Sequence, residues 1–595
     1  MRTQSLVAAA CCLMAGCAAE EPSARRQVQE FLQMYNEIDQ RLGTVATEAA
    51  WLASTDVTEE HTGRRIGAER AHAAFRGSRY VIEHSRRFLQ LRGTLEELEF
   101  RQLDKILLNA AESPGTIPEV VAKRIELEAR LSAVLDGFTF CLDERGGKCL
   151  KPVTPNQIDD VLVRSRDLAE RRRVWETSKQ IGPALKGGLA EVRDLRNRVA
   201  TELGYSSYFH LQVADYGLTV AEMMQLMQRT LREVEPLYRR LHRYARRKLA
   251  VRYGQPVPER IPAHWLPNRW GQEWPGLAET PNLDDLFRGR SPEWIVQQAE
   301  RFYTSLGWPP LPRSFWERSD LYQLPPGATR KKNTHASAWH VDRDRDVRSL
   351  MSVVPNFRWF ETAHHELGHV YYFLAYSHPN VPPVLREGAN RAFHEAIGDL
   401  IGMAARQEPY LRQIGILPAD RKINRMEWLL DEALDSAVVF LPWSAGVMTH
   451  FEHELYERKL PAEQFNRRWW ELVERYQGIE PPAPRGEEYC DGCTKTHVID
   501  DPAQYYDYAL ASLIKYQLHD YIARSILKQD PRSCNYYGNK EVGQWLWDLL
   551  RLGATRDWRQ LLREKTGEDL SSRALLEYFR PLEQYLEQQE RAAVR

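Results

Sequence analysis

The chain has 595 residues, 43% of them hydrophobic and 27% charged, and its formal net charge is −1. This balance of charge gives no reason to expect nucleic acid or an acidic polymer as a partner. The 17 Trp, 26 Tyr and 18 Phe supply a large apolar core, and the chain is longer than one compact core accommodates, so we expect two lobes around a cleft.

Residues 1–16 predict an export signal. One arginine precedes the apolar stretch 6–15, which is too short to span a bilayer. The sequence L-M-A-G-C that ends at Cys17 resembles a bacterial lipoprotein cleavage site, which would make Cys17 the lipidated N-terminus; an ordinary signal peptide is the alternative. We therefore expect an exported protein, either a lipoprotein on the periplasmic side of a bacterial membrane or a secreted or periplasmic protein. A linker at 17–27 would precede a folded domain at 28–590 with two subdomains.

The folded domain is predicted to be mainly α-helical. Apolar residues recur at helical spacing, with few glycines, in the segments 23–42, 45–51, 63–90, 94–111, 155–180, 189–203, 220–253 and 293–305. A loop-rich stretch interrupts these helices at 254–289. Residues 332–341 predict a short strand, beside which an extended peptide could pair with the backbone.

His365, Glu366 and His369 form the motif H-E-x-x-H within 360–372, an apolar run without proline that predicts a helix. Residues four apart share one face of a helix, so both imidazoles can bind one metal ion. Glu366 projects beside them, where a general base for a water on the metal belongs. The motif alone leaves the alternative of two histidines on an ordinary helix.

A second helix could supply the third ligand. Prolines at 379, 382 and 383 end the first helix, and Asn390 is a suitable N-cap for the next one. Packed antiparallel, this helix could bring Glu395 to the metal and leave a fourth position for water. Asp399 lies four residues on, where its carboxylate could orient a ligand histidine. Without a metal, Glu395 and Asp399 would be the solvated face of an amphipathic helix.

Several motifs in this order resemble the angiotensin-converting enzyme family, the peptidyl-dipeptidase A peptidases. They are H-H-E-L-G-H at 364–369, R-E-G-A-N-x-x-F-H-E-A-I-G-D at 386–399, H-A-S-A-W at 335–339, and W-W at 469–470 with Y-Q-G at 476–478. The resemblance covers roughly residues 28–590. It implies a mainly α gluzincin-type metallopeptidase with two helical lobes around a deep cleft, a few short strands near the metal, and a lid of N-terminal helices.

The resemblance also implies a pocket for the end of a peptide. Gln272, Lys495 and Tyr505 would bind the terminal carboxylate, Lys495 as a point charge and the others by hydrogen bonds. Phe440 would form a wall of the pocket for the last side chain. The carboxypeptidase branch of the family carries an arginine at the place of Gln272 and removes single residues, so Gln272 favours dipeptide release.

Further roles follow from the same resemblance. His335 would donate to a substrate carbonyl, and the backbone of Ala336 and Ala338 would pair with the peptide. His497 and Tyr508 would stabilise the transition state, which is typically worth about 10²–10³ in rate per donor.

The chain departs from the family at two positions. Members that need chloride carry arginines where this chain has Val473 and Asp507. We therefore expect no chloride requirement.

The cysteines fit an oxidising compartment. Cys141 and Cys149 match a disulfide position of the family. Cys490 and Cys493 form C-x-x-C, for which a disulfide or free thiols are favoured over a zinc site because no second C-x-x-C occurs. Cys534 is the odd one, and the pairing of these last three cysteines stays open.

These features predict a monomeric peptidyl-dipeptidase with one Zn²⁺ held by His365, His369 and Glu395. It would release dipeptides from short peptides that have a free C-terminal carboxylate. One alternative is a zinc oligopeptidase or carboxypeptidase with a different cleavage register. The other is a non-catalytic binding module. Such a module would be expected to lack Glu366 or one of the three predicted ligands, and this chain has all four residues.

Overall fold

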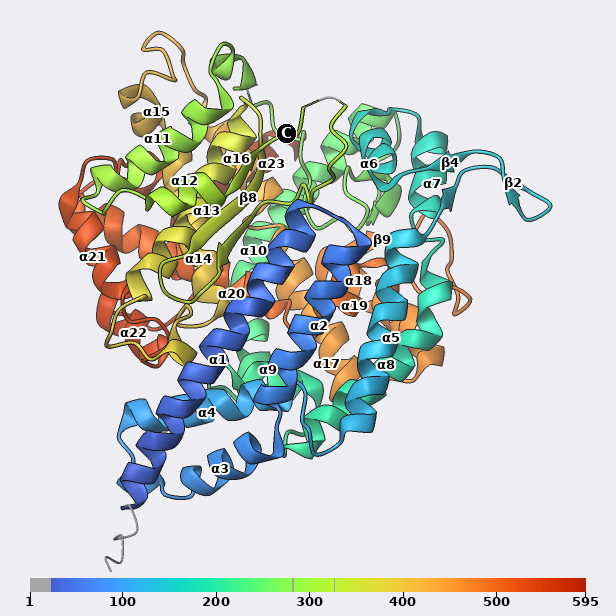
Figure 1. Cartoon of the computed structure of the whole chain (residues 1–595). Helices are drawn as coiled ribbons and strands as arrows, with labels where there is room; N and C mark the ends of the chain where they lie inside the picture. Colours follow the sequence, from blue (N-terminus) through green and yellow to red (C-terminus); the bar gives the residue numbers. More distant parts are fainter. Residues whose placement is uncertain (1–22, 281–282, 326, 595) are drawn as a thin grey trace, which may run out of the picture.

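The computed structural model describes residues 23–594 except 281, 282 and 326, so the predicted signal and Cys17 lie outside the described residues. The chain is mainly α-helical with a few short strands, as predicted (Figure 1). No helix in the described part is both long and apolar enough to cross a membrane.

The N-terminal helices differ from the prediction in where they break, and two of them, Pro118–Gly137 and Tyr208–Ala214, were not predicted. They are α1 (Ala24–Thr55), α2 (Glu59–Arg76), α3 (Arg79–Leu89), α4 (Glu97–Ala111), α5 (Pro118–Gly137), α6 (Pro155–Arg164), α7 (Leu168–Thr177), α8 (Gly182–Glu202), α9 (Tyr208–Ala214) and α10 (Val220–Tyr253). The bounds predicted for α10 are confirmed. The segments predicted at 23–42 and 45–51 form the single helix α1. The segments predicted at 63–90 and 155–180 are each divided into two helices.

The break between α2 and α3 lies at a close crossing of two chain segments. A Cβ atom at Gly77 would lie 1.8 Å from the backbone oxygen of Ser113, so a close chain crossing occupies the space of a side chain. Ser78 then caps α3 by accepting a hydrogen bond from the backbone N–H of Val81. Helical periodicity continues through this point and therefore does not reveal the break.

The C-terminal helices include the two that carry the predicted metal ligands, α13 and α14. They are α11 (Pro292–Ser305), α12 (Arg313–Arg318), α13 (Phe357–Tyr376), α14 (Arg391–Arg406), α15 (Glu408–Gln413), α16 (Arg425–Asp435), α17 (Thr449–Tyr456), α18 (Phe465–Gln477), α19 (Thr496–Asp500), α20 (Tyr506–Tyr521), α21 (Lys540–Leu550), α22 (Trp558–Thr566) and α23 (Arg573–Val594). Two π-helical turns, at Pro442–Met448 and Ile522–Ile526, adjoin α17 and α20.

The strands form small sheets. β1 (Phe140–Cys141) pairs with β4 (Pro152–Val153), β2 (Glu144–Arg145) with β3 (Lys148–Cys149), and β5 (Ile261–Pro262) with β9 (Ile479–Glu480). The largest sheet has the order β6 (Asp320–Tyr322), β8 (Val347–Val353), β7 (Ser337–His340). The prediction of a strand at 332–341 was therefore too long.

Strand β7 is an edge strand. It runs antiparallel to β8, with Ala338 opposite Ser349, and no strand in the described part pairs with its other edge. Its backbone can therefore accept an added extended chain.

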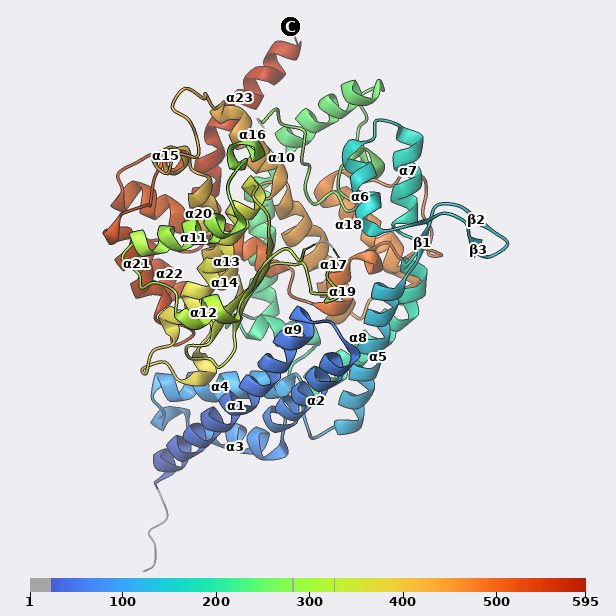
Figure 2. The same cartoon turned by 45° about the horizontal axis from the view of Figure 1, so that its top comes forward.

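Helices α1 and α2 lie side by side across the front of the molecule in both views (Figures 1 and 2). An ion pair fastens α1 to the loop between β7 and β8, with Arg343 Nη1 2.8 Å from Asp39 Oδ2. Trp51 on α1 also packs edge-on against Trp339 of β7, with ring centroids 5.5 Å apart. These contacts hold α1 against the edge strand.

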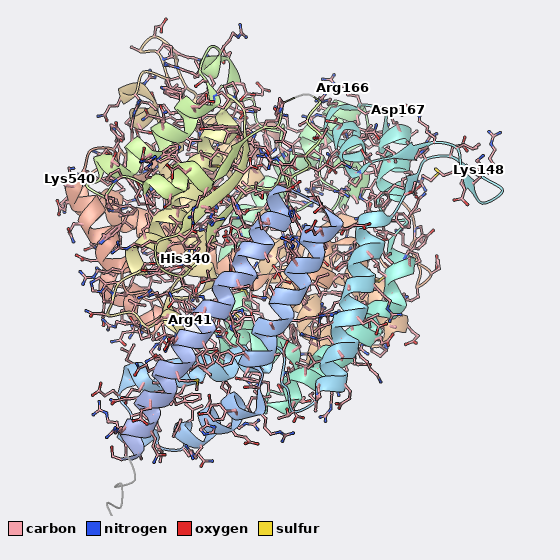
Figure 3. All side chains as sticks on the ribbon, viewed as in Figure 1. Arg41, Lys148, Arg166, Asp167, His340 and Lys540 are labelled. Atoms are coloured by element: carbon pink, nitrogen blue, oxygen red, sulfur yellow. A yellow bond between two sulfur atoms is a disulfide. The ribbon has the colours of Figure 1, made fainter. Side chains whose placement is uncertain are left out.

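Two disulfides are present in the described part. Cys141–Cys149, the predicted pair, closes the base of the hairpin that projects from the body at Lys148 (Figure 3). Cys490–Cys493 is also bonded, which agrees with one of the two outcomes favoured from the sequence. Cys534 is buried and has no disulfide partner among the described residues.

Candidate metal centre

The candidate centre lies between α13 and α14, which pack against each other, while α14 also packs against α20. Each metal helix starts at an asparagine whose side chain accepts a backbone hydrogen bond: Asn356 from Trp359, and Asn390 from Phe393. The N-cap predicted at Asn390 is confirmed.

Two glycines allow α13 and α14 to approach closely. A Cβ atom at Gly368 would lie 3.1 Å from the Cα of Gly398. A Cβ atom at Gly398 would lie 2.8 Å from Cε1 of His365. The imidazole of His365 therefore occupies the space that a side chain at Gly398 would need.

The three predicted ligands converge. Their ligand atoms all lie within 4.8 Å of one another. The Nε2 atoms of His365 and His369 are 3.0 Å apart, and Glu395 Oε2 is 4.0 Å from His369 Nε2. Two imidazoles and one carboxylate are the donor set of a catalytic zinc site, in which water or substrate takes the remaining position.

Each imidazole has a partner at its other nitrogen. Asp399 Oδ1 lies 3.2 Å from His365 Nδ1, which is the position predicted for this carboxylate. His394 Nδ1 lies 2.7 Å from His369 Nδ1. Such contacts fix each ring so that Nε2 faces the metal position. The second nitrogen of His394 is buried and has no hydrogen-bond partner among the described residues.

The electrostatics of the site favour a bound cation. Burial lowers the pKa of His365, but the hydrogen bond and charge of Asp399 outweigh it and raise this pKa to about 9. Burial raises the pKa of Glu366 to about 7, against the opposing effect of His365. A metal ion would replace the proton on His365, and a carboxylate with a pKa near neutrality suits proton transfer.

Two cavities meet at these residues. The first, of about 730 Å³, is lined by His369, Glu395, His497 and Tyr508 among others, and we call it the His497 cavity. The second, of about 830 Å³, is lined by Asp399 and Lys515 among others, and we call it the Lys515 cavity. His335, Ala336, His365 and Glu366 line both cavities, whereas Ala338 lines only the first. The metal position therefore lies where the two cavities join.

The predicted carboxylate-binding residues also come together. Lys495 Nζ donates to Gln272 Oε1 at 2.8 Å, although the two residues are 223 positions apart. Lys495 is 6% exposed and Tyr505 3% exposed, and both lie outside the lining of the two cavities. Burial lowers the pKa of Lys495 to about 8, because the ammonium loses solvation.

An aromatic cluster joins this pocket to the metal centre. Phe440 packs against Tyr505 and Tyr508, with ring centroids 6.2 and 6.1 Å away. Tyr508 Oη lies 3.4 Å from His497 Nε2, so the two predicted transition-state donors are neighbours. Burial lowers the pKa of His497 to about 4 and raises that of Tyr508 to about 12, so Tyr508 is a protonated donor at neutral pH.

Comparison with known proteins identifies the family. The model of the family described as Angiotensin-converting enzyme matches residues 22–594. This chain belongs to that family. It is similar to angiotensin-converting enzyme of Theromyzon tessulatum, at 29% identity over 93% of this chain and 91% of that protein. It is also similar to angiotensin-converting enzyme of Rattus norvegicus, at 28% identity over 94% of this chain but only 43% of that protein.

Sequence reasoning missed three residues at this angiotensin-converting enzyme-type centre. His394 precedes the ligand Glu395, and Lys515 Nζ lies 3.7 Å from Asp399 Oδ2. Arg391 lines the His497 cavity. The sequence contains signals for two of them: Lys515 is a lysine that directly follows the largely apolar run 509–514, and Arg391 is a cation at the start of a helix, where the dipole disfavours it.

Replacement of Gly398 tests the close approach of the two helices. We expect Gly398→Ala to displace the His365 ring and weaken zinc binding by at least about tenfold, the loss typical of a disturbed ligand environment. Gly402→Ala is the matched control on the same helix, because its Cβ would lie 3.7 Å from His365 Cβ, an ordinary contact distance. Zinc affinity, measured by competition with a chromophoric chelator, should change less than twofold in this control. Equal affinities in the two variants would contradict the prediction.

Proposed function

We propose that the protein is a zinc-dependent peptidyl-dipeptidase that releases dipeptides from the free C-terminus of short peptides. The main observation behind this proposal is that His365, His369 and Glu395 converge beside the buried Glu366. Membership of the family supports the same activity. The domain would extend over 28–590 with two subdomains around the cavities, and would act as an exported monomer, attached to a membrane only through a lipid on Cys17.

The side chains of the centre suit peptide hydrolysis. Zinc, when bound by His365, His369 and Glu395, would supply a Lewis acid that lowers the pKa of a water to about 7. Glu366 is 6% exposed and follows a ligand directly on α13, so it can accept the proton of that water and return it to the leaving amine.

The edge strand would hold the peptide in extended form. Ala338 in β7 and Ala336 before it line the His497 cavity, and β7 has an unpaired edge in the described part. Backbone pairing would make binding tolerant of sequence. His335, which is exposed and lines both cavities, would donate to a substrate carbonyl.

His497 and Tyr508 would stabilise the negative charge that develops on the scissile carbonyl oxygen. They lie 3.4 Å apart on the wall of the same cavity as Glu395. Hydrogen-bond donors that are already in position in a partly buried site stabilise mainly the transition state, because the negative charge on the oxygen develops only in that state.

Lys495, Gln272 and Tyr505 would set the cleavage register by binding the terminal carboxylate, with Phe440 beside the last side chain. The Lys495–Gln272 contact places a charged donor and an amide at one point, which suits a carboxylate. A carboxylate held two residues beyond the metal gives dipeptide release.

The first experiment is hydrolysis of an N-blocked tripeptide with a free C-terminus. We expect a dipeptide product that a chelator abolishes, and we expect Glu366→Gln to lower kcat by at least about 10²-fold while zinc stays bound, because the proton acceptor is lost. Mass spectrometry identifies the products. Release of single amino acids would indicate a carboxypeptidase register, internal cleavage would indicate an oligopeptidase, and no cleavage with zinc bound would favour a binding module.

The pH dependence tests the carboxylate pocket. Lys495 is charged below its pKa of about 8 and loses its charge above it. We therefore expect kcat/KM for a free-carboxylate substrate to fall above about pH 8, and Lys495→Met to raise KM about ten- to hundredfold at pH 7. The C-terminal amide of the same peptide should be cleaved poorly and show no such fall. An identical pH profile for both substrates would exclude this role of Lys495.

The surroundings of Asp507 support activity without chloride. Asp507 is 1% exposed, and Arg391 Nε lies 3.4 Å from its Oδ2. Asp501 pairs with the same guanidinium, so the cluster holds one cation and two carboxyl groups and offers no net positive charge to an anion. Val473, the other departure from the family, is buried and apolar.

Replacement of a bulky inert anion by chloride, at fixed ionic strength, should change kcat/KM less than twofold. A rise of several-fold would show that the protein does bind an activating chloride ion.

A further inference from the structure

Arg391 joins three segments that carry proposed catalytic groups. It is the first residue of α14, one helical turn before Glu395. A cation at a helix N-terminus opposes the helix dipole, so partners outside the helix must compensate it. These partners lie on the segments that hold His497 and Tyr508.

The first set of contacts reaches the chain beside His497. Arg391 donates to both carboxylate oxygens of Asp501, from Nη1 to Oδ1 at 2.8 Å and from Nη2 to Oδ2 at 2.6 Å. Nη1 also donates to Gln504 Oε1 at 3.0 Å. The backbone N–H of Asp501 donates in turn to the carbonyl of His497 at 3.0 Å. The guanidinium therefore holds the end of α19, on which His497 lies.

The second set of contacts reaches α20 beside Tyr508. Arg391 Nε lies 3.4 Å from Asp507 Oδ2. The hydroxyl of Tyr216 donates to Asp507 Oδ1 at 2.5 Å and accepts from the backbone N–H of Ala392 at 3.2 Å. Tyr216 thus forms a second bridge between the same two helices.

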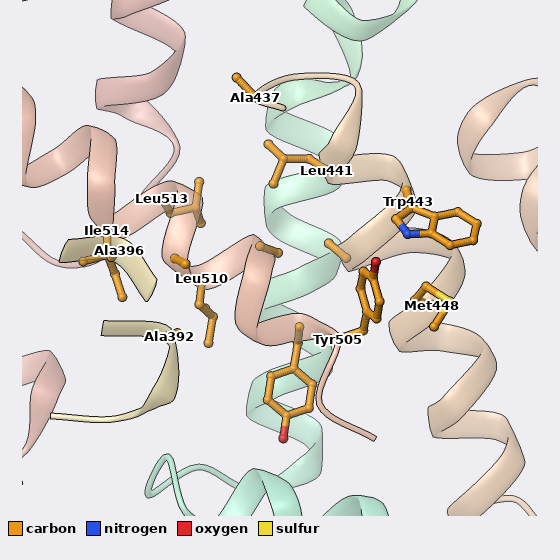
Figure 4. Close-up of a cluster of buried hydrophobic side chains, with 14 of the residues drawn as sticks. Ala392, Ala396, Ala437, Leu441, Trp443, Met448, Tyr505, Leu510, Leu513 and Ile514 are labelled. Atoms are coloured by element: carbon orange, nitrogen blue, oxygen red, sulfur yellow. The ribbon is translucent and has the colours of Figure 1, made fainter. Parts of the chain in front are cut away.

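Apolar packing also joins α14 to α20. Figure 4 shows Ala392 and Ala396 of α14 beside Leu510, Leu513 and Ile514 of α20 in the buried core. This packing keeps the helices side by side, whereas the contacts of Arg391 fix the end of α14 that faces the cavity. Loss of Arg391 should therefore change the site more than the fold.

We propose that Arg391 is a positioning residue that sets the distance between the metal ligand Glu395 and the pair His497 and Tyr508. The proposal rests on the peptidase function proposed above. A bidentate guanidinium fixes orientation as well as distance, which a lysine cannot do. Because the two donors act on the charge of the transition state, their displacement should lower kcat and leave KM largely unchanged.

The test compares Arg391→Gln and Arg391→Lys with wild type. We expect Arg391→Gln to lower kcat about 10²-fold, with KM and zinc affinity changed less than threefold, and we expect Arg391→Lys to recover only part of this loss. Arg313→Gln is the matched control, because Arg313 also begins a helix but its side chain is 90% exposed and pairs with Glu317. Its kinetics should match wild type.

Further measurements separate a positioning role of Arg391 from misfolding and from failure of the proposed activity. Circular dichroism and thermal unfolding report the fold, and Asp507→Asn provides a second variant that loosens the same contact without removing Arg391.

Calorimetry with a phosphinic tripeptide, which mimics the tetrahedral transition state, reports positioning even if wild type cleaves no peptide tested. We expect Arg391→Gln to bind this mimic at least about tenfold more weakly and the product dipeptide unchanged. Equal weakening of both ligands, or a loss of activity that excess zinc restores, would overturn the proposal.

Discussion

The close approach of α13 to α14 is the constraint on which the site depends. Two of the candidate ligands are on α13 and the third is on α14, so the separation of the helices sets the size of the metal position. Gly368 and Gly398 make this separation possible. A Cβ atom at either position would lie closer to the opposite helix or to the His365 ring than an ordinary van der Waals contact. Without this contact, Glu395 would not lie beside His365 and His369, and the candidate site would have only two ligands.

Charged groups around the centre are compensated by opposite charges on other segments. Asp399 lies between His365 and Lys515, and Arg391 lies against Asp501 and Asp507. Attraction between opposite charges therefore holds each of these groups beside its partners. The same pairing that makes these charges tolerable also fixes the orientation of the side chains that would take part in catalysis.

Helix α1, which is far from the centre in the sequence, lies against the edge strand that lines the His497 cavity. The edge strand β7 lines the cavity side of the small sheet, and α1 is bound to the β7–β8 loop through Asp39 and Arg343. A peptide bound along β7 would therefore lie beside a helix from the first tenth of the chain. This arrangement suits short, extended substrates rather than folded proteins.

Local patterns were sufficient for several features. The spacing of His365 and His369 depends only on the pitch of one helix, the Asn390 cap depends on three adjacent residues, and α10 has uninterrupted helical periodicity. The roles suggested for Gln272 and Lys495 came from the family resemblance, because no local pattern relates residues 223 positions apart.

The sequence by itself determined the helical class and the positions of the candidate ligands, which are two histidines beside a candidate base on one helix and a glutamate on the next helix. Only the tertiary structure decided the contacts of His394 and Lys515 and the joining of three segments by Arg391. The physical reason is range: helix pitch and capping act over a few residues, whereas chain crossings and buried charge pairs exist only once distant segments have packed.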